Sequence, residues 1–255
     1  MSAPDAGRVC LITGASRGIG AAVASALSRD GHRVALLGRD AGALDEVAAG
    51  LPGPSLSVPA DVTDAGAVEA AFSRIEGEWG PVEVLVCSAG AGIAAPIVDT
   101  SDQQWAQMLD LNLTAPFRLM RRALPSMTGS GWGRIVVIAS VVAKRGEAQV
   151  AAYTASKHGV LGLVRSAAAE LARSGVTVNA VCPGYVDTPM TDATIEAIAT
   201  RSGRGSDDAR ATLARRQPIG RLIEPDEVAQ AVRFCLANAA VTGQGINVDG
   251  GSVQS

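Results

Sequence analysis

Residues 9–20 read Val-Cys-Leu-Ile-Thr-Gly-Ala-Ser-Arg-Gly-Ile-Gly, an apolar run of strand length that leads directly into a helical pattern. Three glycines, Gly14, Gly18 and Gly20, mark the turn between the two. Glycine is needed where a backbone bends tightly and approaches a phosphate closely, and a helix N-terminus favours the negative charge of that phosphate. Such a loop alone is weak evidence, but its position between a strand and a helix makes it a strong indicator of a phosphate-binding turn.

The rest of the chain repeats this alternation of strand and helix. Apolar runs of strand length occupy residues 9–13, 33–37, 55–59, 83–87, 134–139, 176–182 and 246–248. Helical patterns occupy residues 19–29, 41–49, 65–78, 102–127, 150–173 and 226–237. Strand runs that are apolar throughout imply burial on both faces, and alternation with helices implies right-handed crossovers. The sequence therefore predicts an α/β fold, with one doubly wound (Rossmann) domain over residues 1–255 and a parallel seven-stranded sheet.

The composition restricts the classes of function. The net charge of -3 argues against a nucleic-acid-binding protein, which usually carries a basic face. No run approaches about 18 apolar residues, so the sequence predicts no membrane span. The first seven residues lack the basic-then-apolar order of a signal peptide, which makes a cytoplasmic protein the expectation.

Metal chemistry is also disfavoured. The four cysteines, Cys10, Cys87, Cys182 and Cys235, all lie in apolar stretches, and their spacing matches no metal site. We therefore expect them to be small buried hydrophobic residues. The two histidines, His32 and His158, are too few and too far apart in the sequence to form a zinc site, so no metal site is predicted.

A tyrosine and a lysine one helical turn apart carry the strongest chemical signal. Tyr153 and Lys157 lie in a helical pattern and would share one face of the helix. A phenol has a pKa of about 10, and a nearby ammonium group lowers that pKa. Matching the phenol to neutral pH would take about three pKa units, or roughly 4 kcal/mol. A Tyr–Lys pair is usually a surface pair, but here Ser140 precedes it by thirteen residues, directly after an apolar run.

The glycine turn, Ser140 and the Tyr153–Lys157 pair together resemble the short-chain dehydrogenase/reductase family, from about Arg8 to Gly251. The resemblance implies that Tyr153 protonates the carbonyl oxygen as hydride arrives, or acts as the base in the reverse direction. It implies that Ser140 donates a hydrogen bond to the same oxygen, and that Lys157 lowers the tyrosine pKa and binds the nicotinamide ribose. Asn112 falls on the fourth catalytic position, where it holds a water molecule. An Asn within a helix could instead satisfy a local backbone group.

The end of the second predicted strand indicates which cofactor is used. An NAD enzyme would carry a carboxylate there to hold the ribose 2′-hydroxyl, but this chain has Leu37-Gly38-Arg39. Arg17, within the glycine turn, is a second cation on the same side. Two guanidinium groups suit a 2′-phosphate, so we predict NADP(H) as the cofactor. The alternative is that both arginines are solvated surface residues.

The resemblance assigns the remaining cofactor contacts by position. The expected set is Gly14, Ser16, Arg17, Gly18, Ile19, Gly20, Arg39, Asp61, Val62, Ala89, Gly90, Tyr153, Lys157, Pro183, Gly184, Val186 and Thr188. The chain departs from the family pattern at one point, because the family's Asn-Asn-Ala-Gly appears as Cys87-Ser88-Ala89-Gly90. Replacing both amides removes side-chain hydrogen bonds that would tie the sheet together.

The substrate is less clearly indicated. Residues 170–184 resemble bacterial 3-oxoacyl-thioester reductases and aromatic-polyketide ketoreductases. Carrier-protein reductases typically place arginines beside the site, yet residues 126–133 contain no basic residue and Ser174 occupies the other expected position. An irregular polar segment, residues 188–217, is predicted to be a substrate lid. Its arginines, together with Lys144 and Arg145, could meet coenzyme A phosphates or could be solvated and salt-bridged; those of the lid are Arg201, Arg204, Arg210, Arg215 and Arg216.

These observations give one leading hypothesis and two alternatives. The leading one is an NADPH-dependent reductase of a 3-oxoacyl thioester, on coenzyme A in preference to a carrier protein. The second is a secondary alcohol dehydrogenase or ketoreductase that acts on a free aromatic, cyclic or polyketide ketone. The third is a non-catalytic NADP-binding sensor, against which the intact Ser140, Tyr153 and Lys157 argue. The family resemblance also implies a homotetramer or homodimer that buries the predicted helices 102–127 and 150–173.

Overall fold

Seven parallel strands form one sheet in the computed structural model, which describes residues 7–203 and 205–254. The strand order is β3-β2-β1-β4-β5-β6-β7. The strands are β1 (Val9–Thr13), β2 (Arg33–Gly38), β3 (Ser55–Pro59), β4 (Val84–Cys87), β5 (Gly133–Ile138), β6 (Val176–Pro183) and β7 (Gly245–Val248). Each predicted strand is present, and the predicted parallel, doubly wound sheet is confirmed.

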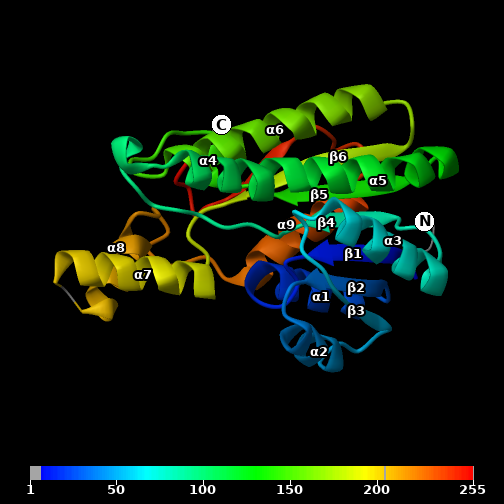
Figure 1. Cartoon of the computed structure of the whole chain (residues 1–255), viewed down its shortest axis with the longest axis horizontal. Helices are drawn as coiled ribbons and strands as arrows, with labels where there is room; N and C mark the ends of the chain where they lie inside the picture. The colour runs from blue at the N-terminus through cyan, green and yellow to red at the C-terminus, as the bar shows by residue number, and fades with distance from the viewer. Residues whose placement is uncertain (1–6, 204, 255) are drawn as a thin grey trace.

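Helices cover both faces of the sheet (Figure 1). They are α1 (Gly18–Arg29), α2 (Ala41–Ala49), α3 (Ala65–Trp79), α4 (Asp102–Leu109), α5 (Ala115–Ser130), α6 (Ala151–Leu171), α7 (Pro189–Ser202), α8 (Ser206–Arg215) and α9 (Pro225–Ala237). One buried cluster joins the sheet to α3, α5 and α6, and a second joins it to α1, α2 and α9. Alternate strand residues enter the two clusters, Leu11 the first and Ile12 the second. Burial on both faces explains why the strand sequences are apolar throughout.

The strand order reverses at β1, which pairs with β2 on one side and β4 on the other. The connections from β1 and β4 therefore leave the sheet in opposite directions, and a crevice forms at the carboxyl ends of these two strands. The sequence places Gly14 directly after β1 and Ser88 directly after β4. The predicted cofactor residues thus lie at the position in the sheet where doubly wound folds bind ligands.

Two predicted segments differ from the structure. Residues 102–127 do not form one regular α-helix, because a short π-helix, Asp110–Thr114, separates α4 from α5. Residues 188–217 are not irregular, since they contain α7 and α8. These two helices extend beyond the sheet in Figure 1, coloured yellow to orange. They bury a small cluster of their own, which includes Ile195 and Leu213.

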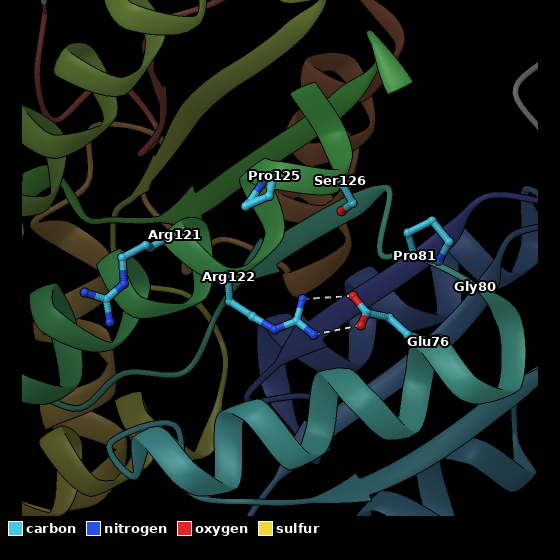
Figure 2. A pocket seen from close by; sticks show the side chains of 7 residues that line it. All are labelled: Glu76, Gly80, Pro81, Arg121, Arg122, Pro125 and Ser126. Carbon is cyan, nitrogen blue, oxygen red and sulfur yellow. Dashed lines mark hydrogen bonds and ion pairs between the residues drawn. The ribbon is translucent and has the colours of Figure 1, made fainter. Parts of the chain in front are cut away.

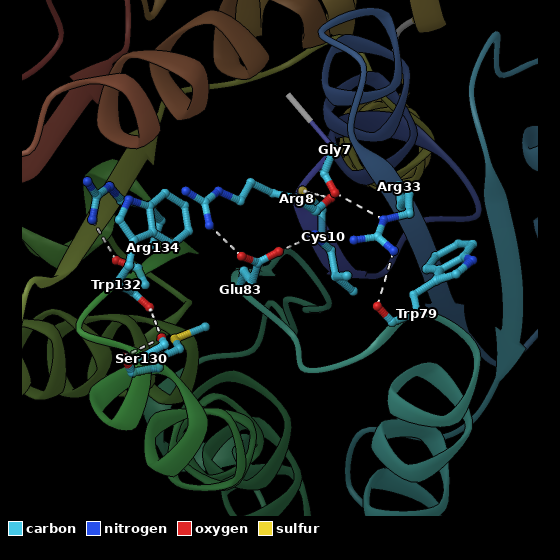
Figure 3. A network of polar contacts seen from close by, with 12 residues as sticks. Gly7, Arg8, Cys10, Arg33, Trp79, Glu83, Ser130, Trp132 and Arg134 are labelled. Atoms are coloured by element: carbon cyan, nitrogen blue, oxygen red, sulfur yellow. Dashed lines mark hydrogen bonds and ion pairs between the residues drawn. The ribbon is translucent and has the colours of Figure 1, made fainter. Parts of the chain in front are cut away.

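The amino ends of the strands are tied together on the opposite edge of the sheet (Figure 3). The guanidinium group of Arg8 pairs with Glu83 at 2.5 Å and lies 4.0 Å from the ring centre of Trp132. Arg134 lies 4.6 Å from the same ring, and Arg33 donates to the carbonyl of Trp79 at 3.1 Å. The arginines nearest the start of β5 are therefore engaged within the fold.

Two further expectations concern burial. All four cysteines are free and buried, as predicted. Burial raises the pKa of the Cys87 thiol to about 12, which keeps it protonated at neutral pH. In the described part of the chain, no helix has both the length and the apolar character required to cross a bilayer.

Candidate active site

The glycine turn after β1 has the geometry of a phosphate cradle. Gly14 and Gly18 have φ values of 64° and 57°, in the left-handed region that favours glycine. A Cβ on Gly14 would lie 2.8 Å from the backbone of Ala89, and one on Gly18 would lie 3.1 Å from the Thr188 methyl group. Arg17 is the N-cap residue of α1, and its side chain forms no capping hydrogen bond there. The first amide groups of α1 can therefore donate to a phosphate, and the site fits a dinucleotide.

Two arginines stand at the edge of this cradle. Arg17 and Arg39 are exposed, and neither forms an ion pair with a described residue. Asp40 follows Arg39, but its carboxylate accepts a hydrogen bond from the Ala43 amide at 3.1 Å and caps α2. The acid nearest the end of β2 is therefore occupied as the cap of α2. The guanidinium groups of Arg17 and Arg39 remain available to an anion. This arrangement fits a 2′-phosphate better than a free 2′-hydroxyl.

Asp61, one of the predicted cofactor contacts, is held by local hydrogen bonds. The Asp61 carboxylate accepts from the backbone and the hydroxyl of Thr63, at 2.9 and 2.7 Å. These bonds, with the positive charge of Arg39 as a smaller cause, hold the pKa of Asp61 below its usual value. Val62 is buried in the first core cluster. Asp61 and Val62 thus form a rigid end to the β3 connection.

Other hydrogen bonds replace those that the two family asparagines would make at Cys87-Ser88-Ala89-Gly90. The hydroxyl group of Thr13, at the end of β1, accepts from the backbone amides of both Ser88 and Ala89 at 3.1 Å. This pair of bonds joins the carboxyl ends of β1 and β4, although neither family asparagine is present. A threonine at the end of the first strand was a signal that the sequence reasoning did not use.

Ser140, Tyr153 and Lys157 come together at the carboxyl end of β5. Ser140 is 8% exposed and caps a short helical turn, where it accepts from the Val142 amide at 3.3 Å. Tyr153 lies in the first turn of α6, and Lys157 lies one turn further along. The Lys157 ammonium group donates to the Ile138 carbonyl at 2.9 Å and lies 5.6 Å from the centre of the Tyr153 ring. Ser140 lies close enough to the Tyr153 hydroxyl to lower the pKa of that group.

The pKa of Tyr153 is raised, whereas a lowered pKa was expected for a phenol beside Lys157. Burial raises the pKa of Tyr153 to about 12, the nearby Ser140 hydroxyl lowers it, and the charges of Glu147 and Tyr185 raise it further. Burial also lowers the pKa of Lys157 to about 8. Lys157 is not among the causes of the Tyr153 shift, and the predicted lowering of the tyrosine pKa by Lys157 stays a prediction. Tyr153 holds its proton at neutral pH.

Asn112 lies in the π-helix and is 1% exposed. Its amide nitrogen donates to the Ala91 carbonyl at 3.0 Å, and its oxygen accepts from the Ala91 amide at 3.3 Å. A Cβ on Gly90 would lie 2.9 Å from the Asn112 oxygen and 3.6 Å from the Lys157 nitrogen. Asn112 and Lys157 therefore converge on Gly90, and the glycine leaves room for both.

The segment after β6 closes the crevice from the other side. Pro183 and Val186 are buried, and Thr188 lies against Gly18 of the glycine turn. Gln217 is 1% exposed and bonds both backbone polar atoms of Tyr185, at 2.9 and 3.1 Å. Ser16 and Ile19 lie half-buried within the turn itself. The structure thus brings the predicted residues of the β1, β4 and β6 connections to one place.

Sequence reasoning missed a polar group beside Tyr153. The Glu147 carboxylate accepts from the Tyr185 hydroxyl at 2.8 Å and from Arg216 at 3.1 Å. Glu147 lies between Ser140 and Tyr153 in the sequence, and Tyr185 directly follows Pro183-Gly184. Their positions between recognised motifs were the available signal. Charge alone did not identify them, because acidic residues in loops are usually solvated.

Some arginines of the predicted lid, residues 188–217, form ion pairs or hydrogen bonds, and others lie outside the described residues. Arg210 pairs with Asp187 and Asp192, and Arg216 pairs with Glu147. Arg215 donates to the Thr212 hydroxyl at 3.2 Å. The side chain of Arg201 and the whole of Arg204 lie outside the described residues. The salt-bridged alternative therefore holds for Arg210 and Arg216.

A separate hollow of about 500 Å³ lies between α3 and α5 (Figure 2). Its lining includes Arg121 and the ion pair between Arg122 and Glu76, whose closest atoms are 2.7 Å apart. None of the seven residues that line it belongs to the predicted catalytic or cofactor set. The hollow is therefore distinct from the site at the carboxyl ends of the strands.

Comparisons with known proteins agree with this geometry. The family model described as Enoyl-(Acyl carrier protein) reductase matches residues 14–253. The cis-4-hydroxycyclohexanecarboxylate dehydrogenase of Sinomonas cyclohexanicum is 41% identical over 96% of this chain and 96% of its own length. The 3-oxoacyl-acyl-carrier-protein reductase MabA of Mycobacterium bovis is 39% identical over 97% of this chain and 94% of its own. A crystal structure of a variant actinorhodin polyketide ketoreductase with NADPH superimposes with a TM-score of 0.91, at 37% identity and with 99% of both chains covered.

Proposed function

Because the chain belongs to the short-chain dehydrogenase/reductase family, we propose that it is an NADPH-dependent ketoreductase whose substrate is a 3-oxoacyl thioester. The convergence of Ser140, Tyr153, Lys157 and Asn112 beside the glycine turn is the observation that carries this proposal. A non-catalytic sensor has no need of a complete set of proton-transfer residues. The presence of this set therefore favours an enzyme over a sensor.

The cofactor assignment rests on the charges around the turn. The N-terminus of α1 would bind the pyrophosphate, and Arg17 and Arg39 would bind the 2′-phosphate. Pro183, Gly184, Val186 and Thr188 would face the nicotinamide end, since Thr188 meets the glycine turn there. When bound, NADPH supplies the hydride that is added to the carbonyl carbon.

The chain's own residues would handle the proton. Tyr153 donates its phenolic proton to the carbonyl oxygen, and Ser140 donates a hydrogen bond to the same oxygen. Burial raises the pKa of Tyr153 to about 12, so the phenol is protonated at neutral pH but is a weaker acid than one whose pKa lies near 7. The Lys157 ammonium group and Asn112 lie together behind it, where they can return a proton from solvent to the phenolate.

Two observations bear on the form of the thioester. Residues 126–133 contain no basic residue, and the neighbouring Arg8 and Arg134 are engaged with Glu83 and Trp132. These facts favour coenzyme A over a carrier protein with an acidic surface. A free cyclic ketone is the second candidate, because one relative at 41% identity is named for a cyclohexane substrate.

Oxidation of NADPH and of NADH should be followed with acetoacetyl-CoA, an acetoacetyl carrier protein, an aryl ketone and a decalone. We expect faster turnover with NADPH and the highest kcat/KM for acetoacetyl-CoA. Tyr153→Phe should lower kcat by roughly 10²- to 10⁴-fold and leave NADPH affinity nearly unchanged. A preference for NADH, near-normal activity of Tyr153→Phe, or turnover of no ketone at all would contradict the proposal.

A further inference from the structure

The segment that precedes α6 decides where the first turn of that helix lies. Tyr153 is in this turn, and the helix begins at Ala151, directly after the N-cap residue Val150. The side chain of a valine has no polar atom, so Val150 forms no capping hydrogen bond with the first amide groups of the helix. The start of α6, and Tyr153 with it, is therefore placed by the contacts of residues 147–150.

On one side, residues 147–150 are tied to the connection after β4. The Gln149 carbonyl accepts from the Ala95 amide at 2.7 Å, and Ala95 and Val150 form a parallel β-bridge. Gln149 has a φ of 66°, and among the described residues it is the only one other than glycine with a positive φ. A backbone conformation of this kind persists only where surrounding contacts hold it. Residues 147–150 are thus fixed by their contacts and not by local preference.

On the other side, the segment is tied to the predicted lid. The Glu147 carboxylate accepts from the Tyr185 hydroxyl at 2.8 Å and from Arg216 at 3.1 Å, and Arg216 also donates to that hydroxyl at 3.2 Å. Arg145 is farther from the carboxylate, at 3.9 Å. Tyr185 precedes α7 and packs against the apolar cluster of the two lid helices, whereas Arg216 directly follows α8. Both ends of the predicted lid therefore meet at one carboxylate.

We propose that Glu147 is a positioning residue for Tyr153, and that the Tyr185 hydroxyl holds it, so that the predicted lid and the first turn of α6 are ordered together. This inference rests on the proposed function, because the position of Tyr153 affects turnover only if Tyr153 is the proton donor. It deepens that function, since the lid then also helps to fix the acid that protonates the substrate.

The Tyr185 contact should matter more than the Arg216 contact. The side chain of Arg216 is 52% exposed, so water and salt screen its attraction to Glu147. The Tyr185 hydroxyl belongs to a partly buried residue, and a hydrogen bond to a carboxylate is stronger than one between neutral groups. A general acid must come within hydrogen-bond reach of the oxygen it protonates, and a small misplacement slows the chemical step. Loss of the Tyr185 contact should therefore lower kcat and leave NADPH affinity unchanged.

The test follows the reduction of acetoacetyl-CoA with NADPH by variants of the two residues. Tyr185→Phe keeps the ring in the lid cluster and removes only the hydroxyl, and we expect kcat to fall about tenfold with the Kd for NADPH unchanged. Glu147→Ala should cause a similar loss. Glu147→Gln should recover most of kcat, because its amide oxygen can still accept from Tyr185. The double variant Tyr185→Phe/Glu147→Ala should be no slower than the slower single variant, since both changes break the same bond.

Asp192→Asn is the matched control on the lid. The Asp192 carboxylate pairs with Arg210 at 3.5 Å, a contact between α7 and α8 that does not involve residues 147–150. This variant should keep the wild-type kcat. If Asp192→Asn and Tyr185→Phe lower kcat equally, any weakening of the lid has the same effect, and the inference is overturned.

Amide hydrogen exchange tests the same contact without turnover. Tyr185→Phe should speed exchange in residues 150–157 by at least about fivefold and leave residues 160–171 unchanged. Normal kcat or unchanged exchange at the start of α6 in Tyr185→Phe would refute the inference, and this variant decides alone if Glu147→Ala does not fold by circular dichroism. If the wild type reduces no ketone and the exchange still changes as expected, the proposed function fails while the contact between the lid and α6 stands.

Discussion

Lys157 carries its ammonium group into a position that is only 5% exposed. Burial lowers its pKa from 10.5 to about 8, which means that the folded protein disfavours the charged form by roughly 3 kcal/mol. Below pH 8 the lysine is charged in both the folded and unfolded states, so the full cost is present. Between about pH 8 and 10.5 the folded state loses its proton first, and the cost disappears as pH rises.

We therefore expect Lys157→Met to be inactive but more stable than the wild type at pH 7. The gain should be about 2 kcal/mol, because about 1 kcal/mol is lost with the hydrogen bond to the Ile138 carbonyl. Urea denaturation at pH 7 and at pH 10.5 measures it. The advantage should shrink at the higher pH, whereas an equal or larger advantage there would show that the burial argument is wrong.

The sequence predicted which catalytic residues come together, but it did not predict the pKa of Tyr153. Ser140, Tyr153 and Lys157 come together as the motif spacing predicts, because α6 places two of them one turn apart beside β5. The pKa of Tyr153 could not be predicted, since it depends on Glu147 and Tyr185, which approach from two different connections. Motif spacing says nothing about such groups, because only the folded chain brings them together.

Apolar periodicity predicted where the helices lie, but it did not predict the π-helix within residues 102–127. The pattern over residues 102–127 gave one helix, and the structure inserts a π-helix at Asp110–Thr114. One wider turn shifts the helix face, and it directs Asn112 toward Ala91, where both polar groups of its side chain are bonded. A period of 3.6 cannot reveal such an insertion, because the apolar residues on either side still fit the pattern.

Gln217 holds the base of residues 188–217, the predicted lid. This side chain accepts from the Tyr185 amide and donates to the carbonyls of Tyr185 and Arg221, the last at 2.6 Å. Gln217→Ala leaves the Tyr185 amide and the Arg221 carbonyl without these partners, at a cost of about 1–3 kcal/mol each if they stay buried, whereas the Tyr185 carbonyl still accepts from the Ile223 amide at 2.9 Å. We expect a higher KM for the ketone and faster trypsin cleavage within residues 188–217.

A glutamine outside the lid provides the matched control. Gln244 is exposed, and its side chain donates to the Thr242 carbonyl at 3.2 Å. Gln244→Ala should leave KM and the cleavage rate unchanged. Equal behaviour of Gln217→Ala and Gln244→Ala would show that Gln217 does not hold the lid. The proposal that residues 188–217 form a lid would then lose its main structural support.

At the scale of the whole molecule, the sheet was the most predictable feature. Its strands are apolar throughout because each lies between two helical layers, and this pattern distinguishes them from the amphipathic helices between them. Helices α7 and α8 were not predicted, because they pack chiefly on each other through a small cluster. Their sequence is polar and rich in Arg and Thr, so it carries little of the apolar periodicity by which a helix is predicted.

We predict the subunit contact from large apolar side chains that are exposed in the single chain. Trp105 on α4 and Phe117 on α5 are 43% and 41% exposed, on the helical layer that also contains α6. Large aromatic side chains on a helical surface are typical of an interface between subunits. We expect light scattering to give a mass of two or four times the 25.8 kDa of one chain.

Phe117→Arg places a charge in the predicted interface and should shift the protein toward smaller species. Met190→Arg, at a lid residue that is 51% exposed, should not. A wild-type mass of one chain, or an unchanged mass for Phe117→Arg, would place the contact elsewhere.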